Sequence, residues 1–319
     1  MDLDALGNEA PVRFLLGKGG VGKTAVTCAM GRALATSGRR VLLIELEGRP
    51  EILRAFGIDG ALGYDEQVIY SDPSGGSVSA RHLTPDEALL EYLDDHGLAR
   101  LSRRLLASGV IDVVAGAIPG IREVLLLGKI KQMANESDAD VVLVDCPATG
   151  HAVTLLTSAS GVANAARSGP VRSQADQVVE MLTDPTRSCV VLVTIPEELP
   201  VTETVEAAFR IEEEAGMSLS LIICNRTDLA QPGLDAPAAE IASAAGIAVD
   251  PAVLSTLDAA AAFQRHQVEA GAEQIARLRS ELPLPLVILP RLGSAAIGPD
   301  EVEELADLLA AATVDVSAP

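Results

Sequence analysis

The sequence predicts a doubly wound α/β fold, in which helices cover both faces of a mostly parallel β-sheet and a helical subdomain is inserted. Six short runs are apolar almost throughout instead of alternating with polar residues, which is typical of strands buried on both faces. Helical or Gly- and Pro-punctuated segments separate most of these runs, as parallel strands require. A glycine-rich turn directly follows the first run and precedes a helical pattern.

The expected strands follow the chain in order. The six apolar runs span 12–17, 41–46, 141–145, 189–195, 220–225 and 284–290, and two weaker strands are expected around 67–70 and 77–83. Between 58 and 138 the alternation of strand and helix changes. There Thr84, Pro85 and Glu87 form a helix start with a capping box. We expect the segments 84–136 and 155–185 to form the helical subdomain of one domain that spans 1–319.

Two helical segments leave alternatives open. The stretch 119–133 is apolar around much of its circumference, which fits either a helix enclosed in the core or an exposed groove for a partner. The stretch 160–182 is expected to be a mobile lid or a helical insert. Each of these segments is a candidate for the part of the molecule that changes with its ligand.

A long helix is expected over 252–280, where apolar residues recur at steps of three and four. We expect it to pack against its own domain. A dimer seam is the alternative, although Gln264 and Gly271 interrupt the apolar row. The last helical pattern, GPDEVEELADLLAAA, is acidic and therefore unsuited to anchoring in a membrane.

Charge and composition exclude several functions. Lys and Arg number 24 against 45 Asp and Glu, a net charge of −21 that would repel a nucleic-acid backbone. The N-terminal segment has no basic and apolar leader pattern, and no stretch reaches about 18 consecutive apolar residues. We therefore expect a cytoplasmic protein without nucleic-acid binding or stable membrane insertion.

The four cysteines lie too far apart for a zinc or redox pair of the CxxC type. They occur in apolar or small-residue surroundings, so we expect small buried side chains in a reducing compartment. Aromatic residues make up only 2% of the chain, which excludes the stacking platforms that bind single-stranded nucleic acid.

The stretch LLGKGGVGKTAV at 15–26 contains the complete GxxxxGK[ST] phosphate-binding motif, between an expected strand and an expected helix. Its backbone N–H groups and the helix N-terminus would surround the β-phosphate, Lys23 would span the β- and γ-phosphates, and Thr24 would offer its hydroxyl to Mg²⁺. The predicted phosphate-binding set is Gly17, Gly19, Gly20, Val21, Gly22, Lys23, Thr24 and Ala25.

The same stretch has a second lysine, Lys18, and KGGVGKT matches the deviant Walker A signature. The chain therefore resembles a class of dimeric ATPases that includes partitioning and division-site ATPases, nitrogenase iron protein, and the arsenite-pump and tail-anchored-protein-targeting ATPases. The resemblance implies that Lys18 reaches across a dimer interface to the partner's nucleotide as a catalytic cation. A solvated loop lysine is the alternative.

Within this class, VLLIELEGRPEILRAFG at 41–57 resembles switch I of the arsenite-pump and tail-anchored-targeting family. There a strand ends in an aspartate that positions the attacking water, and Glu47 takes that place here. The additional methylene changes the reach of the carboxylate, so slow hydrolysis is expected. The resemblance also places Glu45 near the Mg²⁺ shell, with a plain strand-end acid as the alternative.

The stretch VVLVDCPATGHAVTLL at 141–156 resembles the family's switch II. Asp145 ends the expected strand where a Walker B carboxylate would hold the Mg²⁺ water. Gly150 would let the loop move when the γ-phosphate leaves. His151 matches a family histidine, for which we expect a hinge or packing role in preference to a catalytic one. PGIRE at 119–123 resembles the family loop that leads into the helical subdomain.

For the base, Asn225 in IICNRTD matches the asparagine with which the family reads adenine. The same letters imitate the guanine-reading NKxD motif, but arginine replaces its lysine and the family precedent is ATP. Pro290 lies where relatives place the loop that covers adenine. ATP and Mg²⁺ are therefore the expected ligands.

Two family features are missing from the sequence. The arsenite-binding cysteines of the pump ATPase have no convincing counterparts, and the zinc-binding CxxC that joins eukaryotic targeting dimers is missing. The segment IELEGRP is most similar to bacterial members of actinobacterial type, some of which pair with a paralogue. A homodimer and a heterodimer with a paralogue both remain open.

The leading hypothesis is an ATP-dependent dimeric switch that binds and releases a hydrophobic protein client or a membrane-protein partner. Its client face is expected to be aliphatic and rich in Leu125, Leu126, Leu127 and Ile130. One alternative is a weakly active or nonhydrolysing nucleotide-binding subunit of a heterodimer, suggested by Glu47. The other is a surface-partitioning ATPase on DNA or membrane, which the negative charge disfavours.

Overall fold

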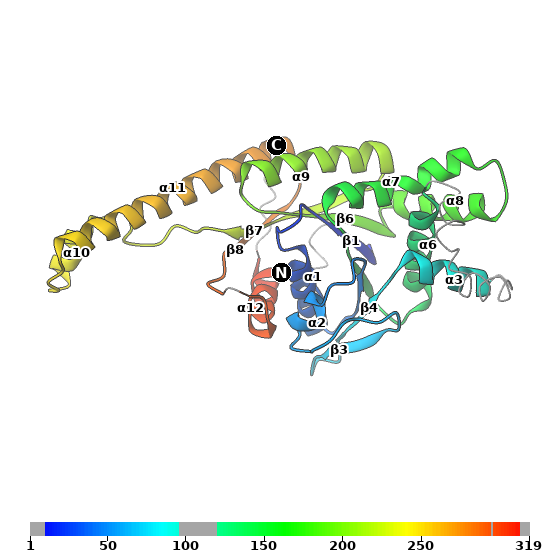
Figure 1. Ribbon diagram of the computed structural model, residues 1–319, viewed down its shortest axis with the longest axis horizontal. Helices are drawn as coiled ribbons and strands as arrows, with labels where there is room; N and C mark the ends of the chain where they lie inside the picture. Colours follow the sequence, from blue (N-terminus) through cyan, green and yellow to red (C-terminus); the bar gives the residue numbers. More distant parts are fainter. Residues whose placement is uncertain (1–9, 96–119, 295, 313–319) are drawn as a thin grey trace.

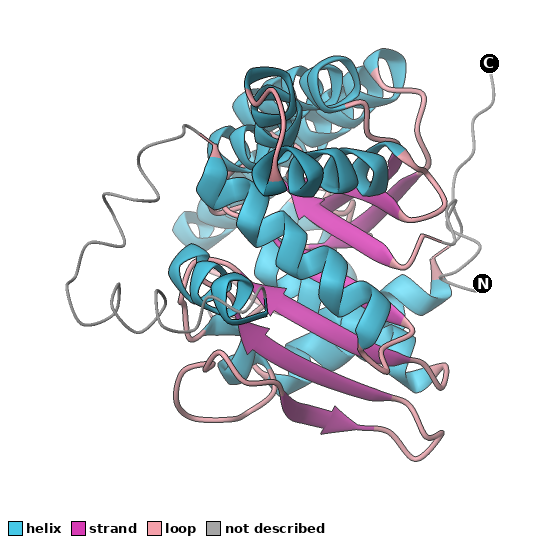
Figure 2. Ribbon diagram, turned by 90° about the vertical axis from the view of Figure 1, so that its right-hand side faces the viewer, coloured by secondary structure: helices cyan, strands magenta, loops and turns pink. Residues whose placement is uncertain are grey.

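The computed structural model describes residues 10–95, 120–294 and 296–312. It contains one eight-stranded sheet in the order β3-β4-β2-β5-β1-β6-β7-β8, with helices on both faces (Figures 1 and 2). All neighbouring strands pair in parallel except β3 and β4, which are antiparallel at one edge. The predicted doubly wound α/β class is confirmed.

The eight strands coincide with the eight runs that the sequence predicts, to within two residues at every end. They are β1 (Val12–Leu16), β2 (Arg40–Glu45), β3 (Gln67–Ser71), β4 (Ser77–His82), β5 (Val141–Asp145), β6 (Ser188–Thr194), β7 (Leu219–Thr227) and β8 (Leu286–Pro290). β1, β5 and β6 are buried along their whole length. Their continuous apolarity follows from helices that cover both faces.

One face of the sheet is covered by the helices nearest the glycine-rich loop that follows β1. These are α1 (Lys23–Thr36), α2 (Glu51–Ala55) and α12 (Pro299–Ala311). Their apolar side chains form a core with alternate residues of the strands, including Leu15 and Leu43. Because β1 and β2 alternate their side chains between the two faces, neighbouring residues such as Phe14 and Ile44 belong to the opposite core.

The other face carries α6 (Ile121–Glu136), α7 (Thr149–Ala165), α8 (Pro170–Thr183) and α9 (Glu198–Arg210), and α9 continues into a π-helical turn, Ile211–Ala215. α3 (Pro85–Asp95) packs against α6, and α6 packs against α7 and α8. The expected insert 160–182 is therefore helical. The part of the predicted segment 84–136 that covers 96–119 lies outside the described residues.

The proposed client face on α6 is wrong in this structure. Leu125, Leu126, Leu127 and Ile130 are all buried, with exposed fractions of 6% or less. α6 lies between α3, α7 and α8, so its apolar circumference is covered by helices on several sides. Of the two alternatives for 119–133, the described residues support a helix enclosed in the core, although Pro119 itself lies outside them.

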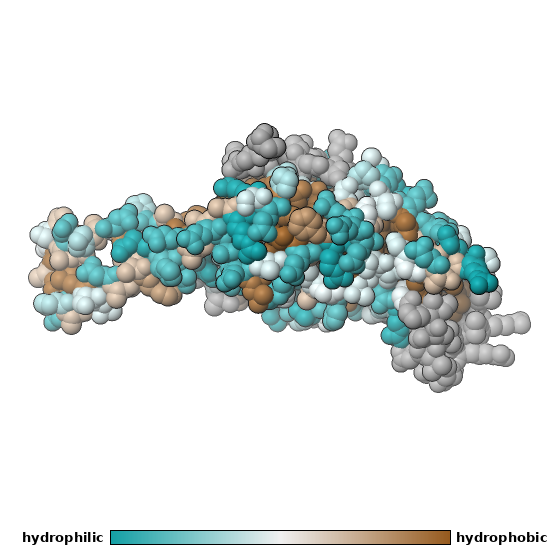
Figure 3. Space-filling view, turned by 90° about the horizontal axis from the view of Figure 1, so that it is seen from above, coloured by the Kyte–Doolittle hydropathy of each residue, from teal (hydrophilic) through white to brown (hydrophobic). Residues whose placement is uncertain are grey.

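The long helix is present as α11 (Pro251–Glu281), but it packs against its own domain only near its end. Gly271, Ile275 and Leu278 are its buried residues, whereas the first part projects from the body together with α10 (Ala238–Ala244) (Figure 1). Apolar side chains on this arm are open to solvent, among them Ile247 and Phe263 (Figure 3). The periodicity of apolar residues predicts that the segment is helical, but it does not show how much of the helix packs against the body.

Among the described residues, no helix has both the length and the apolar character that crossing a bilayer requires.

Candidate functional site

The phosphate-binding loop, residues 17–22, joins the end of β1 to the start of α1. Gly17 lies so close to β6 that a Cβ atom would come within 2.0 Å of the Val193 carbonyl oxygen, so no larger residue fits there. Two side chains from β7 hold the loop. Asn225 Nδ2 donates to Val21 O at 2.9 Å, and Arg226 Nη1 donates to Gly20 O at 3.0 Å.

Lys23 is the first residue of α1, and Thr24 and Ala25 follow it in the first turn. The backbone N–H groups of this turn have no partner within the helix, so they favour an anion. The Lys23 ammonium group folds back over the loop and donates to Gly17 O at 2.8 Å and to Lys18 O at 3.3 Å. Burial lowers the Lys23 pKa from its ordinary value, although the nearby Asp145 carboxylate opposes this effect. A partly desolvated cation of this kind binds phosphate oxygens strongly.

Asp145 ends β5 directly beside α1. Thr24 Oγ1 donates to Asp145 Oδ2 at 2.6 Å, and Thr27 Oγ1 lies 3.5 Å from Oδ1. Burial raises the pKa of Asp145 to about 6, against the opposing effects of Thr24 and Lys23. A hydroxyl and a carboxylate in contact fit the oxygen preference of Mg²⁺.

Residues 46–50 connect β2 to α2 and lie within the stretch 41–57 that resembles switch I; they are called the switch I loop below. Glu45 at the end of β2 is buried, and its two carboxylate oxygens accept from Glu47 N and Gly48 N at 2.7 Å each. His82 Nδ1 lies 2.6 Å from Oε2 of the same carboxylate. These contacts favour the strand-end acid over the Mg²⁺ ligand for Glu45, whose metal role stays a prediction.

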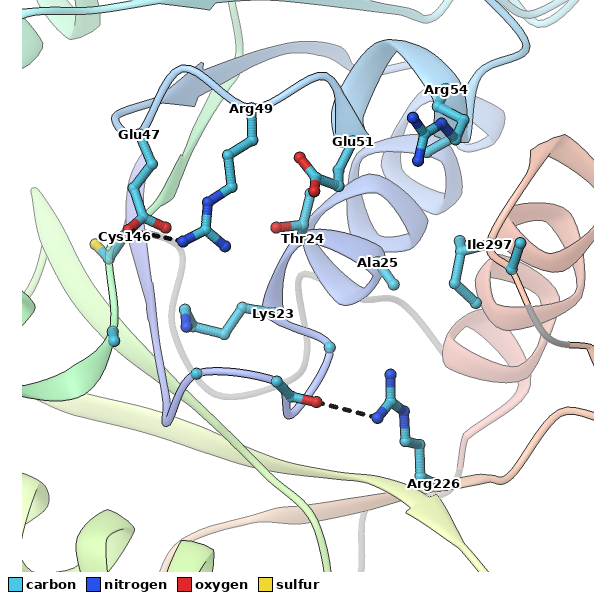
Figure 4. A pocket seen from close by; sticks show the side chains of 16 residues that line it. Lys23, Thr24, Ala25, Glu47, Arg49, Glu51, Arg54, Cys146, Arg226 and Ile297 are labelled. Carbon is cyan, nitrogen blue, oxygen red and sulfur yellow. Dashed lines mark hydrogen bonds and ion pairs between the residues drawn. The ribbon is translucent and has the colours of Figure 1, made fainter.

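A cavity of about 430 Å³ opens over the loop and contains Lys23, Thr24 and Glu47 (Figure 4). Sequence reasoning did not assign several of its lining residues, namely Arg49, Glu51, Arg54, Arg226 and Ile297. Arg49, Glu51 and Arg54 all lie within the stretch 41–57 that resembles switch I, so their position close after Glu47 in the sequence was the available signal. Ile297 follows β8 and reaches the site only through the fold.

A second cavity, of about 340 Å³, shares Ala25, Arg226, Ala296 and Ile297 with the first. Asn225 and Pro290, the residues predicted to contact the base, both line it. Asp228 is the residue that would read guanine, but both its oxygens accept from Arg291, at 3.0 and 3.1 Å. This bidentate pair leaves the carboxylate little capacity for a base.

The family model described as "Anion-transporting ATPase" matches residues 11–168, which include the phosphate-binding loop, switch I and Asp145. Residues 11–168 belong to the anion-transporting ATPase family. The mostly parallel sheet with helices on both faces agrees with this family's α/β fold.

Curated relatives match this chain over spans of 143 to 252 residues. ATPase BagA of Mycobacterium tuberculosis is 38% identical over 224 residues, which are 67% of this chain and 64% of BagA. A putative arsenical pump-driving ATPase of Halobacterium salinarum is 26% identical over 252 residues, 70% of this chain and 37% of the relative. ATPase get3 of Schizosaccharomyces japonicus is 29% identical over 143 residues, 45% of this chain and 42% of the relative. This chain therefore matches less than two thirds of the length of these relatives.

In this anion-transporting ATPase domain, Lys18 does not point into the 430 Å³ cavity. Its Nζ lies 2.8 Å from Oε1 of Glu203 on α9, an ion pair within the same chain. The predicted reach of Lys18 across a dimer interface stays a prediction, because the structure contains one chain. Lys18 is not a freely solvated loop lysine, because it is paired with Glu203.

The stretch 141–156, which resembles the family's switch II, runs from β5 into α7. Gly150 and His151 lie in the first turn of α7, and both are exposed. The packing role expected for His151 is therefore wrong in this structure, while a hinge role stays a prediction. The four cysteines are free and buried, as expected, and burial raises the pKa of the Cys146 thiol beside the cavity. Among the described residues, no group of three or more His, Cys, Asp or Glu side chains has the arrangement of a metal site.

Proposed function

We propose that this chain is a dimeric ATPase switch that uses Mg²⁺ and ATP to bind and release a hydrophobic protein client or a membrane-protein partner. One observation carries the catalytic part of the proposal. Lys23, Thr24 and Glu47 line one cavity, and Thr24 donates a hydrogen bond to Asp145. Family membership and the names of the relatives, all ATPases, give further support.

The residues have separate tasks in the proposed reaction, in which water attacks the γ-phosphorus of ATP and the bond to ADP breaks. Lys23 and the loop N–H groups hold the β- and γ-phosphates, while Glu47 orients the water and accepts its proton. Thr24 and Asp145 hold Mg²⁺, which when bound neutralises phosphate charge. Asn225 and Pro290 border the base, and the engagement of Asp228 by Arg291 favours adenine over guanine.

Steady-state turnover with ATP and GTP tests the reaction. We expect Mg²⁺-dependent release of phosphate from ATP, at least 10-fold faster than from GTP, and loss of turnover in Lys23→Ala and Glu47→Gln. Wild-type turnover equal to that of Glu47→Gln would instead favour the second candidate, a nucleotide-binding subunit that depends on a paralogue for hydrolysis. The glutamate at position 47 is the observation that favours this candidate.

Of the four buried α6 residues, Leu126, Leu127 and Ile130 belong to a main core and Leu125 does not, so we propose that a client surface opens at Leu125 through a change of conformation. Leu125 belongs to a small cluster with Leu89 and Leu93, separate from the two main cores. Such a cluster between α3 and α6 can open at lower cost than a main core. Hydrogen exchange in α3 and α6 should therefore differ between ADP and a γ-phosphate analogue. Identical exchange in the two states would contradict the coupling.

A further inference from the structure

The switch I loop is fixed at its base rather than loose. Glu45 is 3% exposed, and it binds the backbone N–H groups of both Glu47 and Gly48. Gly48 has φ 72°, a left-handed conformation that favours glycine, and His82 Nδ1 contacts Glu45 Oε2, the same oxygen that accepts from Gly48 N. The buried Glu45 carboxylate therefore fixes the backbone path of the switch I loop. This path sets the directions in which the Glu47 and Arg49 side chains point.

This geometry places two opposite charges over the phosphate-binding loop. Glu47 and Arg49 both line the 430 Å³ cavity, and Figure 4 shows the Arg49 side chain pointing into it, towards Lys23. Arg49 Nη2 lies 3.3 Å from Glu47 Oε1. Among the described residues, Glu47 is the one ion-pair partner of Arg49, whose side chain is 62% exposed.

The pair is weak enough to be exchanged. An exposed ion pair of this length contributes little stability, and two of the other three cations that line the cavity have protein partners. Lys23 and Arg226 each donate to loop carbonyl oxygens. A terminal phosphate carries more charge than a carboxylate and offers several oxygens to a planar guanidinium group, so it competes well with Glu47 for Arg49.

We propose that Arg49 recognises the terminal phosphate of a bound nucleoside triphosphate from within the same chain, and that Glu47 holds it until that phosphate arrives. Arg49 then adds, beside Lys23, a contact that the cavity makes with a triphosphate and not with a diphosphate. When the Arg49 guanidinium group moves from Glu47 to the terminal phosphate, the Glu47 carboxylate loses its ion-pair partner at the same time. This inference rests on the proposed function, because it assigns a ligand to the same cavity.

Equilibrium binding tests the proposal without relying on turnover. Mg-ADP and the nonhydrolysable analogue Mg-AMP-PNP are titrated calorimetrically into the full chain as wild type, Arg49→Gln, Arg49→Lys and Arg210→Gln. Arg210→Gln is the matched control, because it also removes an exposed arginine paired with a glutamate, Glu214, but on α9 outside the cavity.

We expect Arg49→Gln to bind ADP as the wild type does and to lose about 10- to 100-fold in affinity for AMP-PNP, the range of a charge-assisted contact. Arg49→Lys should recover part of the loss, and Arg210→Gln should behave as wild type. A preference for AMP-PNP that survives unchanged in Arg49→Gln would overturn this inference alone. A wild type that binds neither nucleotide would overturn the proposed function and this inference with it.

The role of Glu47 has its own test in a double-mutant cycle. Glu47→Gln should raise AMP-PNP affinity when Arg49 is present, because the arginine no longer has to leave its partner, and should have no such effect in Arg49→Gln. Strictly additive effects of the two substitutions would show that Glu47 does not hold Arg49.

Discussion

Asp145 is a buried carboxylate whose pKa, about 6, lies above its ordinary value of 3.8. The folded chain therefore binds this proton more tightly than the unfolded chain does, and the free energy of unfolding falls as pH rises from about 4 to about 6. Above that window the full cost applies, about 3 kcal/mol at most at 1.36 kcal/mol per pKa unit. A site that holds Mg²⁺ must keep this charge despite the cost.

Asp145→Asn should therefore stabilise the metal-free chain at pH 8, by up to about 3 kcal/mol, and the gain should shrink as pH falls towards 4. The asparagine Oδ1 can still accept from Thr24. Urea denaturation in EDTA at pH 8 and pH 5 measures the effect. The same substitution should abolish stabilisation by Mg-nucleotide.

Asp140→Asn is the control at the other end of the same strand. Its pKa is lowered by the Arg40 backbone N–H, so its charge stabilises the folded chain above pH 4 and the substitution should destabilise it at pH 8. If Asp145→Asn were also destabilising at pH 8, burial would not be the main influence on Asp145.

At the scale of the element, α11 passes through two environments. Its last part packs against the body, and its first part is exposed to solvent. Leu278 is 0% exposed against the body, whereas Leu257 is 50% exposed on the projecting arm. Leu278→Ala should lower the free energy of unfolding by about 2–5 kcal/mol. Leu257→Ala, with the same change in helix propensity, should alter it by less than about 0.5 kcal/mol.

Chemical denaturation of the two variants measures the difference directly. Equal losses in Leu278→Ala and Leu257→Ala would mean that the arm is packed in solution, for instance against a second chain. The dimer seam that the sequence left open for this helix would then regain support.

The elements themselves were predictable to different degrees. The strands could be predicted because full burial requires an uninterrupted apolar run, and such runs are visible in the sequence. α6 could not be assigned to core or surface, because an apolar circumference does not say what covers it. α11 shows the converse limit, because its apolar spacing continues well beyond the part that the body covers.

At the scale of the whole molecule, the ion pair between Lys18 and Glu203 joins the phosphate-binding loop to α9 within one chain. If Lys18 serves a partner's nucleotide, this ion pair must break when two chains associate. Its side chains are 28% and 34% exposed, so its free energy is about 1 kcal/mol or less. Breaking it is then a small part of the cost of pairing.

Glu203→Gln should therefore promote nucleotide-dependent pairing modestly, by about fivefold or less in dissociation constant, and Lys18→Ala should abolish it. Sedimentation velocity with increasing Mg-AMP-PNP measures the dissociation constant. Glu206→Gln, an exposed acid on the same helix, is the control and should behave as wild type. Lys18→Ala chains that pair as the wild type does would contradict the expected role of this lysine.

The sequence by itself determined the α/β class, the eight strands and the phosphate-binding loop, because backbone burial and phosphate binding each require a local residue pattern. It also placed Thr24 in the first turn of α1 and Asp145 at the end of β5, because the pattern locates both elements. The tertiary structure alone decided the partners: Glu45 with the switch I backbone, Asn225 with the loop, and Lys18 with Glu203. These contacts join residues that are distant in the chain or depend on a turn's exact path, and no local pattern encodes which long-range surfaces meet.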